Sequence, residues 1–203
     1  MSLQERRSLS DPWHGRARRL RWQPLGRGAR PPAALRPWLT VPTSLTRKLE
    51  EQVGRVSVRI LQQGVGVPLP DEAQSSARPC LIRDVLLQDS AGRNLVLAHS
   101  VLPGTPRGPL HPMLKRLGRQ ALGSLLFTRP GFVRWQREWA RLDSRHPLYR
   151  AAQVQSEQAG QPLPAKLWAR RACFSPLRNN RSSGNSGGRA QTVQVTEVFL
   201  LLA

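Results

Sequence analysis

The sequence predicts an α+β fold: a single domain built on an antiparallel β-sheet of about six strands, with helices packed over one face. Three observations lead to this prediction. The 203-residue chain is long enough for one domain with a substantial core and short for two. Apolar residues alternate along segments near both ends of the chain, between turn-forming residues. In the middle of the chain they recur every three or four positions, as in helices.

The N-terminal part of the chain predicts a disordered tail followed by a helix. Residues 1–20 carry many arginines and few apolar side chains, so we expect them to stay unfolded and the domain to span residues 21–203. In TSLTRKLEEQV, apolar residues recur every four positions from Leu45 onward, which predicts a helix. Ser44 can cap its first turn, and Gly54 can end it.

Three strands are predicted next, and the last two form a hairpin. Val56, Val58 and Ile60 alternate with polar residues in RVSVRILQQG, which is typical of a strand. The segments CLIRDVLL and LVLAHSVLP, residues 80–87 and 95–103, flank the turn sequence DSAGRN. Two strands joined by such a turn pair in the antiparallel direction.

The middle of the chain predicts helices. LHPMLKRLGRQALGSLLFT repeats its leucines at helical spacing but contains glycines, so we expect helical turns joined by a bend. In PGFVRWQREWARLD, Phe132, Trp135, Trp139 and Leu142 form an apolar stripe, which predicts a second helix. HPLYRAAQVQSEQ predicts a third, with Pro147 near its start.

The C-terminal part of the chain returns to strands. LPAKLWARRACF and QTVQVTEVFLLL are the two predicted strands. Between them lies an insert rich in Gly, Ser and Asn, about residues 178–190, which predicts a flexible hairpin connection.

Composition and charge limit the partners that we expect. The net charge of +20 favours nucleic acid, but 29 of the 32 basic residues are arginines spread over the whole chain. The tryptophans fall mostly in the tail and on the predicted helices, so stacking platforms for bases are scarce, and we expect no nucleic-acid partner.

The cysteines and the apolar runs indicate a cytoplasmic protein. Cys80 and Cys173 lie in apolar, strand-like runs without metal-ligand spacing, so we expect free buried thiols in a reducing compartment. No apolar run approaches the roughly 20 residues that cross a bilayer, and none follows Arg6 and Arg7 as an export signal requires.

Two charged residues interrupt the apolar faces of predicted strands. Because alternate side chains of a strand point to opposite faces, Arg83 shares a face with Leu81, Val85 and Leu87. Glu197 shares a face with valines and a phenylalanine in TVQVTEVFLLL. An unpaired buried charge is costly, so the two residues either pair with each other or contact a ligand.

A ligand for both residues would be small, anionic and hydroxylated. The planar guanidinium of Arg83 suits a carboxylate, and Glu197 can accept a hydrogen bond from a hydroxyl. Other catalytic patterns are scarce: the histidines lack metal-ligand spacing, and His99, on a predicted strand, is expected to be structural. No phosphate-binding glycine loop or nucleophile elbow is present. We therefore predict neither a metal nor a cofactor.

Five blocks of the sequence, in this order, resemble the bacterial chorismate lyase family: SLTRKLEEQVGRVSVRILQQG, LIRDVLLQDSAGRNLVLAHSVLP, LGRQALGSLLFT, LWARRACF and VTEVFL. The resemblance runs from about Arg21 to Leu201. It implies a lyase that splits chorismate into 4-hydroxybenzoate and pyruvate, the entry step of ubiquinone biosynthesis. It also implies helical flaps that close over the ligand. We expect such an enzyme to be a monomer.

The resemblance implies four site residues. The family's ligand contacts fall on Leu45 in SLT, Arg83 in IRD, Leu122 in ALG and Glu197 in TEVF. In this interpretation Arg83 and Glu197 are the catalytic residues: Arg83 anchors the ring carboxylate, and Glu197 binds the C4 hydroxyl. Leu45 and Leu122 pack against the ring from the flaps. Leu45 stands where some family members have methionine, a change that conserves volume.

The residues alone leave alternatives open. Strand parity places only one of Arg170 and Arg171 inward, where it can meet the second carboxylate of chorismate, and a surface role for both is the alternative. Two other function classes compete with the lyase: a basic nucleic-acid-binding module, and a non-catalytic carboxylate-sensing domain of related fold. The sequence lacks a helix-turn-helix segment, which disfavours the sensing domain.

Overall fold

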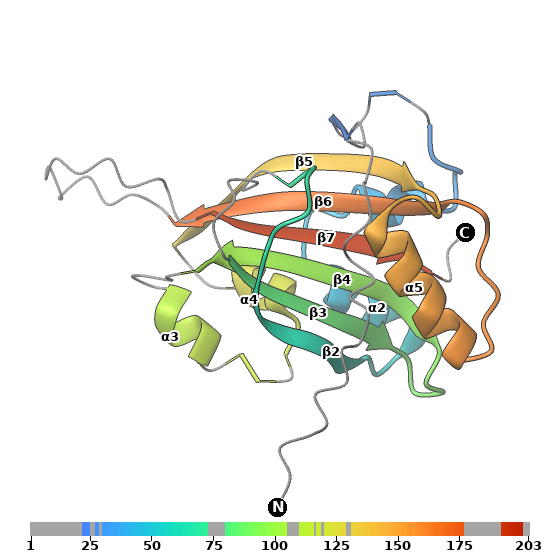
Figure 1. Ribbon diagram of the computed structural model, residues 1–203, viewed down its shortest axis with the longest axis horizontal. Helices are drawn as coiled ribbons and strands as arrows, with labels where there is room; N and C mark the ends of the chain where they lie inside the picture. The colour runs from blue at the N-terminus through green and yellow to red at the C-terminus, as the bar shows by residue number, and fades with distance from the viewer. Residues whose placement is uncertain are drawn as a thin grey trace, which may run out of the picture.

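The computed structural model describes residues 22–24, 27–28, 30–72, 80–104, 110–115, 117–118, 120–128, 131–176 and 192–200. The predicted N-terminal tail and the Gly- and Ser-rich insert lie outside these residues. The described chain forms one seven-stranded sheet with every neighbouring pair antiparallel, in the order β1-β5-β6-β7-β4-β3-β2 (Figure 1). The predicted α+β class and antiparallel sheet are therefore confirmed.

The sheet consists of one very short strand and six longer ones. Their bounds are β1 (Gln23–Pro24), β2 (Ser57–Gly66), β3 (Cys80–Gln88), β4 (Asn94–Pro103), β5 (Phe132–Leu142), β6 (Leu167–Pro176) and β7 (Val193–Phe199). The helices are α1 (Arg36–Leu39), α2 (Leu45–Val53), α3 (Leu110–Lys115), α4 (Leu122–Thr128) and α5 (Pro147–Gln158). None of these described helices is long and apolar enough to cross a membrane.

Local signals place several of these elements as predicted. The Ser44 hydroxyl accepts a hydrogen bond from the Arg47 N–H and caps α2, and Gly54, with φ of +75°, ends it. Strands β3 and β4 form the predicted hairpin. In its turn, the Asp89 carboxylate accepts hydrogen bonds from two backbone N–H groups. Strands β6 and β7 pair antiparallel on either side of the insert, as expected.

Helices cover both faces of the sheet, whereas the sequence predicted one covered face. The α2 face carries the side chains of Arg83, Val85 and Leu87, and its core includes residues of α1 and α2. The α5 face carries Asp84 and Leu86, and α5 packs against it, in front of the sheet in Figure 1. Strand β3 is accordingly buried along most of its length.

The prediction of a helix over residues 132–142 was wrong, because this segment is strand β5. Val133, Trp135 and Arg137 are exposed while the residues between them are half-buried, which is the period of a strand. Aromatic residues spaced three and four apart also fit that period once a bulge at Arg134/Gln136 shifts the register. The segment pairs with β6 along its whole length, which satisfies its backbone and overrides the helical pattern.

The tryptophans are consequently distributed differently from the prediction. Trp135 and Trp139 lie on strand β5 and not on a helix, whereas Trp168 lies on a strand, β6, as predicted. Trp139 and Trp168 are buried and contact each other edge to face, with ring centroids 6.4 Å apart, whereas Trp135 is exposed. Cys80 and Cys173 are both buried, as predicted.

Candidate active site

The four predicted site residues, which are far apart in the sequence, line one cavity on the α2 face. Arg83 comes from β3 and Glu197 from β7, while Leu45 and Leu122 stand at the first positions of α2 and α4. We call this space the Arg83 cavity. Its walls are otherwise mostly apolar, as in pockets that bind small molecules.

Strand β4 leaves room for the cavity because its side chains there are small. It runs between β3 and β7 and pairs Ser100 with Arg83 and Ala98 with Glu197. Side chains of paired residues stand on the same face, so Arg83 and Glu197 rise on either side of a floor made of a serine and an alanine. The sheet register therefore sets the separation of the two charges.

The roof of the cavity is held by a contact between two helix starts. The hydroxyls of Ser44 and Ser124 lie 2.9 Å apart and share a hydrogen bond. This contact joins the N-terminus of α2 to the first turn of α4, so Leu45 and Leu122 are both buried above the sheet. These helices are the ones for which the sequence resemblance implies flaps.

Arg83 is buried and held by neutral oxygens. It donates hydrogen bonds to the Gln63 side chain on β2 and to the backbone carbonyls of Gly118 and Gln120, at 2.8 and 3.1 Å. These contacts use three of the five N–H donors of a guanidinium and leave two for a ligand. Burial lowers the pKa of Arg83 from its ordinary value, although an arginine side chain remains charged in proteins.

Glu197 pairs with Arg170 instead of Arg83. Arg170 lies on the adjacent strand β6, and its Nε is 2.5 Å from a carboxylate oxygen of Glu197. Arg170 also donates to the backbone carbonyls of Trp38 and Val41. Among the described residues Arg83 forms no ion pair with an acid. The alternative of a direct Arg83–Glu197 pair does not match this arrangement.

Neither Arg170 nor Arg171 lies on the surface, so the alternative of a surface role for both residues is wrong. They are 7% and 9% exposed and point to opposite faces, as parity requires. Arg170 lies on the α2 face beside Glu197. Arg171 pairs with Glu138 at 2.6 Å and stacks on the Trp22 ring at 4.3 Å.

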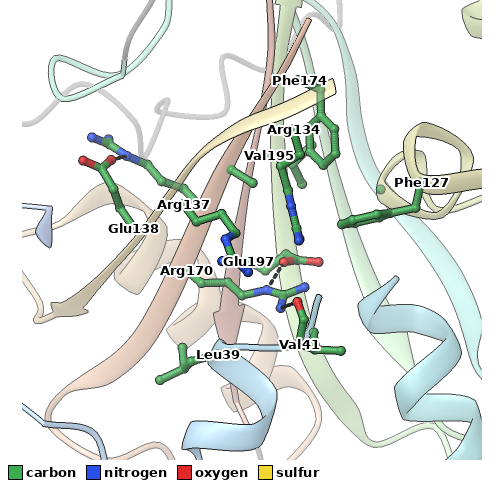
Figure 2. A pocket seen from close by; sticks show the side chains of 13 residues that line it. Leu39, Val41, Phe127, Arg134, Arg137, Glu138, Arg170, Phe174, Val195 and Glu197 are labelled. Carbon is green, nitrogen blue, oxygen red and sulfur yellow. Dashed lines mark hydrogen bonds and ion pairs between the residues drawn. The ribbon is translucent and has the colours of Figure 1, made fainter. Parts of the chain in front are cut away.

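A second cavity adjoins the first and is rich in arginine. We call it the Arg134 cavity; it shares Gly123, Val195 and Glu197 with the Arg83 cavity. Figure 2 shows the side chains of Arg134, Arg137 and Arg170 extending toward Glu197.

Arg134 is the half-buried cation of this second cavity. It donates a hydrogen bond to the Pro42 carbonyl at 2.7 Å, and its guanidinium lies 4.7 Å from the centroid of the Phe127 ring. Burial, with the nearby charges of Arg137 and Arg170, lowers the pKa of Arg134 to about 10. The sequence prediction missed Arg134 because it assigned this segment to a helix. The exposed positions Val133, Trp135 and Arg137 alternate only in the folded structure, and the aromatic spacing fits a helix equally well, so no sequence signal singles out Arg134.

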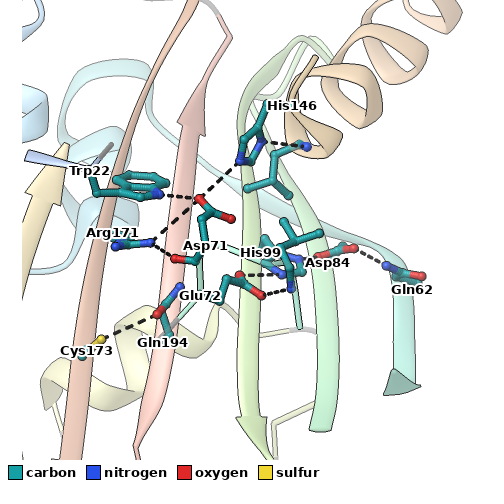
Figure 3. A network of polar contacts seen from close by, with 12 residues as sticks. Trp22, Gln62, Asp71, Glu72, Asp84, His99, His146, Arg171, Cys173 and Gln194 are labelled. Atoms are coloured by element: carbon teal, nitrogen blue, oxygen red, sulfur yellow. Dashed lines mark hydrogen bonds and ion pairs between the residues drawn. The ribbon is translucent and has the colours of Figure 1, made fainter. Parts of the chain in front are cut away.

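The buried charges of the α5 face are paired with one another (Figure 3). His99 forms ion pairs with Asp84, at 2.5 Å, and with Glu72, at 2.9 Å. Burial by itself lowers the pKa of His99, but the two carboxylates outweigh burial and raise the pKa well above the ordinary value of 6.5. His99 thus lies away from both cavities, consistent with the structural role expected for it.

Asp71 is the centre of a second group on the α5 face. Its carboxylate accepts a hydrogen bond from the Trp22 indole N–H at 2.5 Å and lies 3.4 Å from the His146 ring. Burial tends to raise the pKa of Asp71, but the hydrogen bonds from His146 and Trp22 hold it below its ordinary value. Arg171 donates to the Asp71 backbone carbonyl at 2.6 Å.

Comparison with known proteins gives the family. The chorismate lyase family model matches residues 17–202. A protein named "Probable chorismate pyruvate-lyase" from Dechloromonas aromatica is 38% identical over 186 residues, which cover 90% of this chain and 96% of that protein. Proteins of the same name from Aromatoleum aromaticum and Thiobacillus denitrificans are 37% and 40% identical, over 84% and 70% of this chain and 86% and 76% of their own lengths. The chain therefore belongs to the chorismate lyase family.

Proposed function

We propose that the protein converts chorismate to 4-hydroxybenzoate and pyruvate, and that the Arg83 cavity is the place where it does so. The main observation behind this proposal is that Leu45, Arg83, Leu122 and Glu197, far apart in the sequence, line one cavity. Membership in the chorismate lyase family supports the same reaction.

The charges of the cavity match the two ends of the ring. The ring carboxylate of chorismate accepts a hydrogen bond from an N–H donor of Arg83 that protein oxygens leave unused. Such charge-assisted hydrogen bonds contribute about 1.5 to 3 kcal/mol. The C4 hydroxyl, at the opposite end of the ring, donates to Glu197. Leu45 and Leu122 cover the ring and keep water away from it.

The reaction needs little from the protein beyond this placement. The C3–O bond breaks, its electrons leave with the enolpyruvyl group, and C4 loses a proton, so that the ring becomes aromatic. The hydrogen given up by C4 appears in the methyl group of pyruvate, so the two products together contain every atom of chorismate. The protein holds a reactive conformer in a dry cavity and stabilises the charge that develops on the departing oxygen.

Arg170 supports this chemistry by positioning Glu197. Its Nε contacts the carboxylate, while its Nη1 is anchored to two backbone carbonyls near α1. A fixed cation beside Glu197 holds the carboxylate in one orientation, so that it can accept the hydrogen bond of the C4 hydroxyl.

We further propose that residues 21–203 form the working domain, that it acts in the cytoplasm as a monomer without a cofactor, and that its product enters ubiquinone biosynthesis. The family match over residues 17–202 is consistent with a domain of this extent. Analytical ultracentrifugation of the full chain tests the monomer: a sedimentation coefficient that rises with concentration would contradict it.

The experiment that tests the function is a direct assay. Purified protein is mixed with chorismate, pyruvate is followed through a coupled lactate dehydrogenase reaction, and 4-hydroxybenzoate is quantified by chromatography. The proposal predicts both products in equal amounts, at a rate proportional to protein concentration. Failure to form pyruvate above the rate of a heat-inactivated sample would refute it.

A further inference from the structure

We propose that Arg134 binds the second carboxylate of the substrate, the one carried by the enolpyruvyl group that leaves, in the cavity adjoining the Arg83 cavity. This inference rests on the proposed function and extends it to a specificity-determining residue. Arg134 lies on β5 and takes no part in the Arg83 cavity itself.

The position of Glu197 directs the leaving group toward Arg134. Glu197 belongs to the walls of both cavities, together with Gly123 and Val195. The enolpyruvyl ether is attached at C3, the carbon next to the one that carries the hydroxyl. When the C4 hydroxyl contacts Glu197, the C3 substituent must lie beside the same shared wall. Glycine at position 123 adds no side chain there, so the wall leaves room for the ether to pass.

The charges of the second cavity call for an anion. Of the four arginines that line it, Arg170 is paired with Glu197 and Arg171 with Glu138. In the described part of the chain, Arg134 and Arg137 have no such acidic partner, so the lining carries two surplus positive charges. A half-buried group of like charges is unfavourable without a counterion, and the carboxylate of the enolpyruvyl group supplies one.

Arg134 is better placed than Arg137 to bind that anion. Arg137 is exposed, whereas Arg134 is half-buried and already held by the Pro42 carbonyl and the Phe127 ring. A guanidinium that is fixed before binding loses little side-chain freedom when the ligand arrives. The hydrogen bond to Pro42 uses one donor, so four N–H donors remain for a carboxylate.

Arg134 must therefore distinguish substrate from product. Chorismate carries the second carboxylate, and 4-hydroxybenzoate does not. Replacing Arg134 should weaken the binding of chorismate and leave the binding of 4-hydroxybenzoate unchanged. A residue that only supported the fold would weaken both.

The test compares Arg134→Gln, Arg134→Lys and Arg141→Gln with the unmodified protein. Arg141 is the matched control because it lies on the same strand, is exposed and lines neither cavity. For each protein, kcat and KM for chorismate come from the pyruvate assay, and Kd for 4-hydroxybenzoate from calorimetry. Loss of a charge-assisted contact predicts that Arg134→Gln lowers kcat/KM by roughly 10- to 100-fold, mostly through KM, with Kd for the product within about twofold.

The lysine variant and the control complete the design. Arg134→Lys keeps the charge and should recover part of the loss, and Arg141→Gln should behave as the unmodified protein does. An Arg134→Gln variant with unchanged KM, or with product affinity weakened as much as substrate affinity, would overturn the inference. Either result leaves the proposed function standing, because that function fails only if the unmodified protein does not split chorismate.

Discussion

The two faces of the central sheet differ in how completely their buried charges are paired. On the α5 face, His99 is bracketed by Asp84 and Glu72, and Arg171 is paired with Glu138. On the α2 face, Arg83 contacts only neutral oxygens among the described residues. Each of these charges on the first face has an oppositely charged partner, whereas the second face carries surplus positive charge around two adjoining cavities.

Neighbouring residues on the same strands produce this difference. Arg83 and Asp84 follow each other on β3, as Arg170 and Arg171 do on β6, and each pair divides between the faces. A buried charge therefore does not mark a binding site by itself. Charges that satisfy one another stabilise the fold, and charges left for a small anion indicate a site.

The largest expected effect is the loss of stability when a buried ion pair of the α5 face is broken. His99→Ala removes the cation between two buried carboxylates, which should lower the free energy of unfolding by roughly 3 to 5 kcal/mol. Urea unfolding followed by circular dichroism measures it. Arg47→Ala is the control, because both partners of its ion pair with Glu51 are exposed and such a pair contributes less than about 1 kcal/mol. Equal losses in the two variants would remove the distinction between the faces.

Removing a charge from the α2 face should instead remove function. Arg83→Ala deletes the anchor of the ring carboxylate, so both turnover and 4-hydroxybenzoate affinity should fall by about 100-fold or more, while the protein stays folded. Pyruvate release and calorimetry measure these quantities. Arg59→Ala, on β2 and exposed, is the matched arginine control. An Arg83→Ala chain that fails to fold would assign Arg83 to structure instead.

The pH dependence of stability should come from the α5 face. Because the folded protein raises the pKa of His99 well above 6.5, its contribution to stability is fully present below about pH 6.5. It is lost as the pH rises through the raised value, at up to about 1.4 kcal/mol per pH unit. Urea unfolding between pH 6 and 10 measures the slope. The same series in His99→Gln should be flatter, and an identical slope would contradict this assignment.

The smallest effect should come from the apolar roof of the Arg83 cavity. Leu45→Met conserves volume and adds no charge, so we expect kcat/KM to change by less than about tenfold. The pyruvate assay checks this directly. A loss as large as that of Arg83→Ala would mean that the roof, and not the charge, dominates binding.

The sequence was sufficient to predict an element where the spacing of its apolar residues fitted only one kind of secondary structure. Alternation identified β3 and β7, and with them Arg83 and Glu197 as charges among apolar neighbours. It could not identify β5, because aromatic residues at positions 132, 135 and 139 fit a helix as well as a bulged strand. Arg134 was missed for that reason.

The choice between Arg170 and Arg171 had a different obstacle. Strand β6 is buried on both faces, with Trp168 and Phe174 on one side and Leu167, Ala169 and Cys173 on the other. Because both faces of the strand are apolar, the alternation of side chains does not show which face carries the site. Only the packing of α1 and α2 on one face and α5 on the other resolves which arginine lies beside Glu197.

A crystal structure with bound 4-hydroxybenzoate tests the central claim most directly. The account predicts that the ring lies between Leu45 and Leu122, with its carboxylate on the Arg83 guanidinium and its hydroxyl on Glu197. Arg170 should still contact the Glu197 carboxylate. A structure in which Arg83 contacts Glu197 directly, with the ligand bound elsewhere, would contradict it.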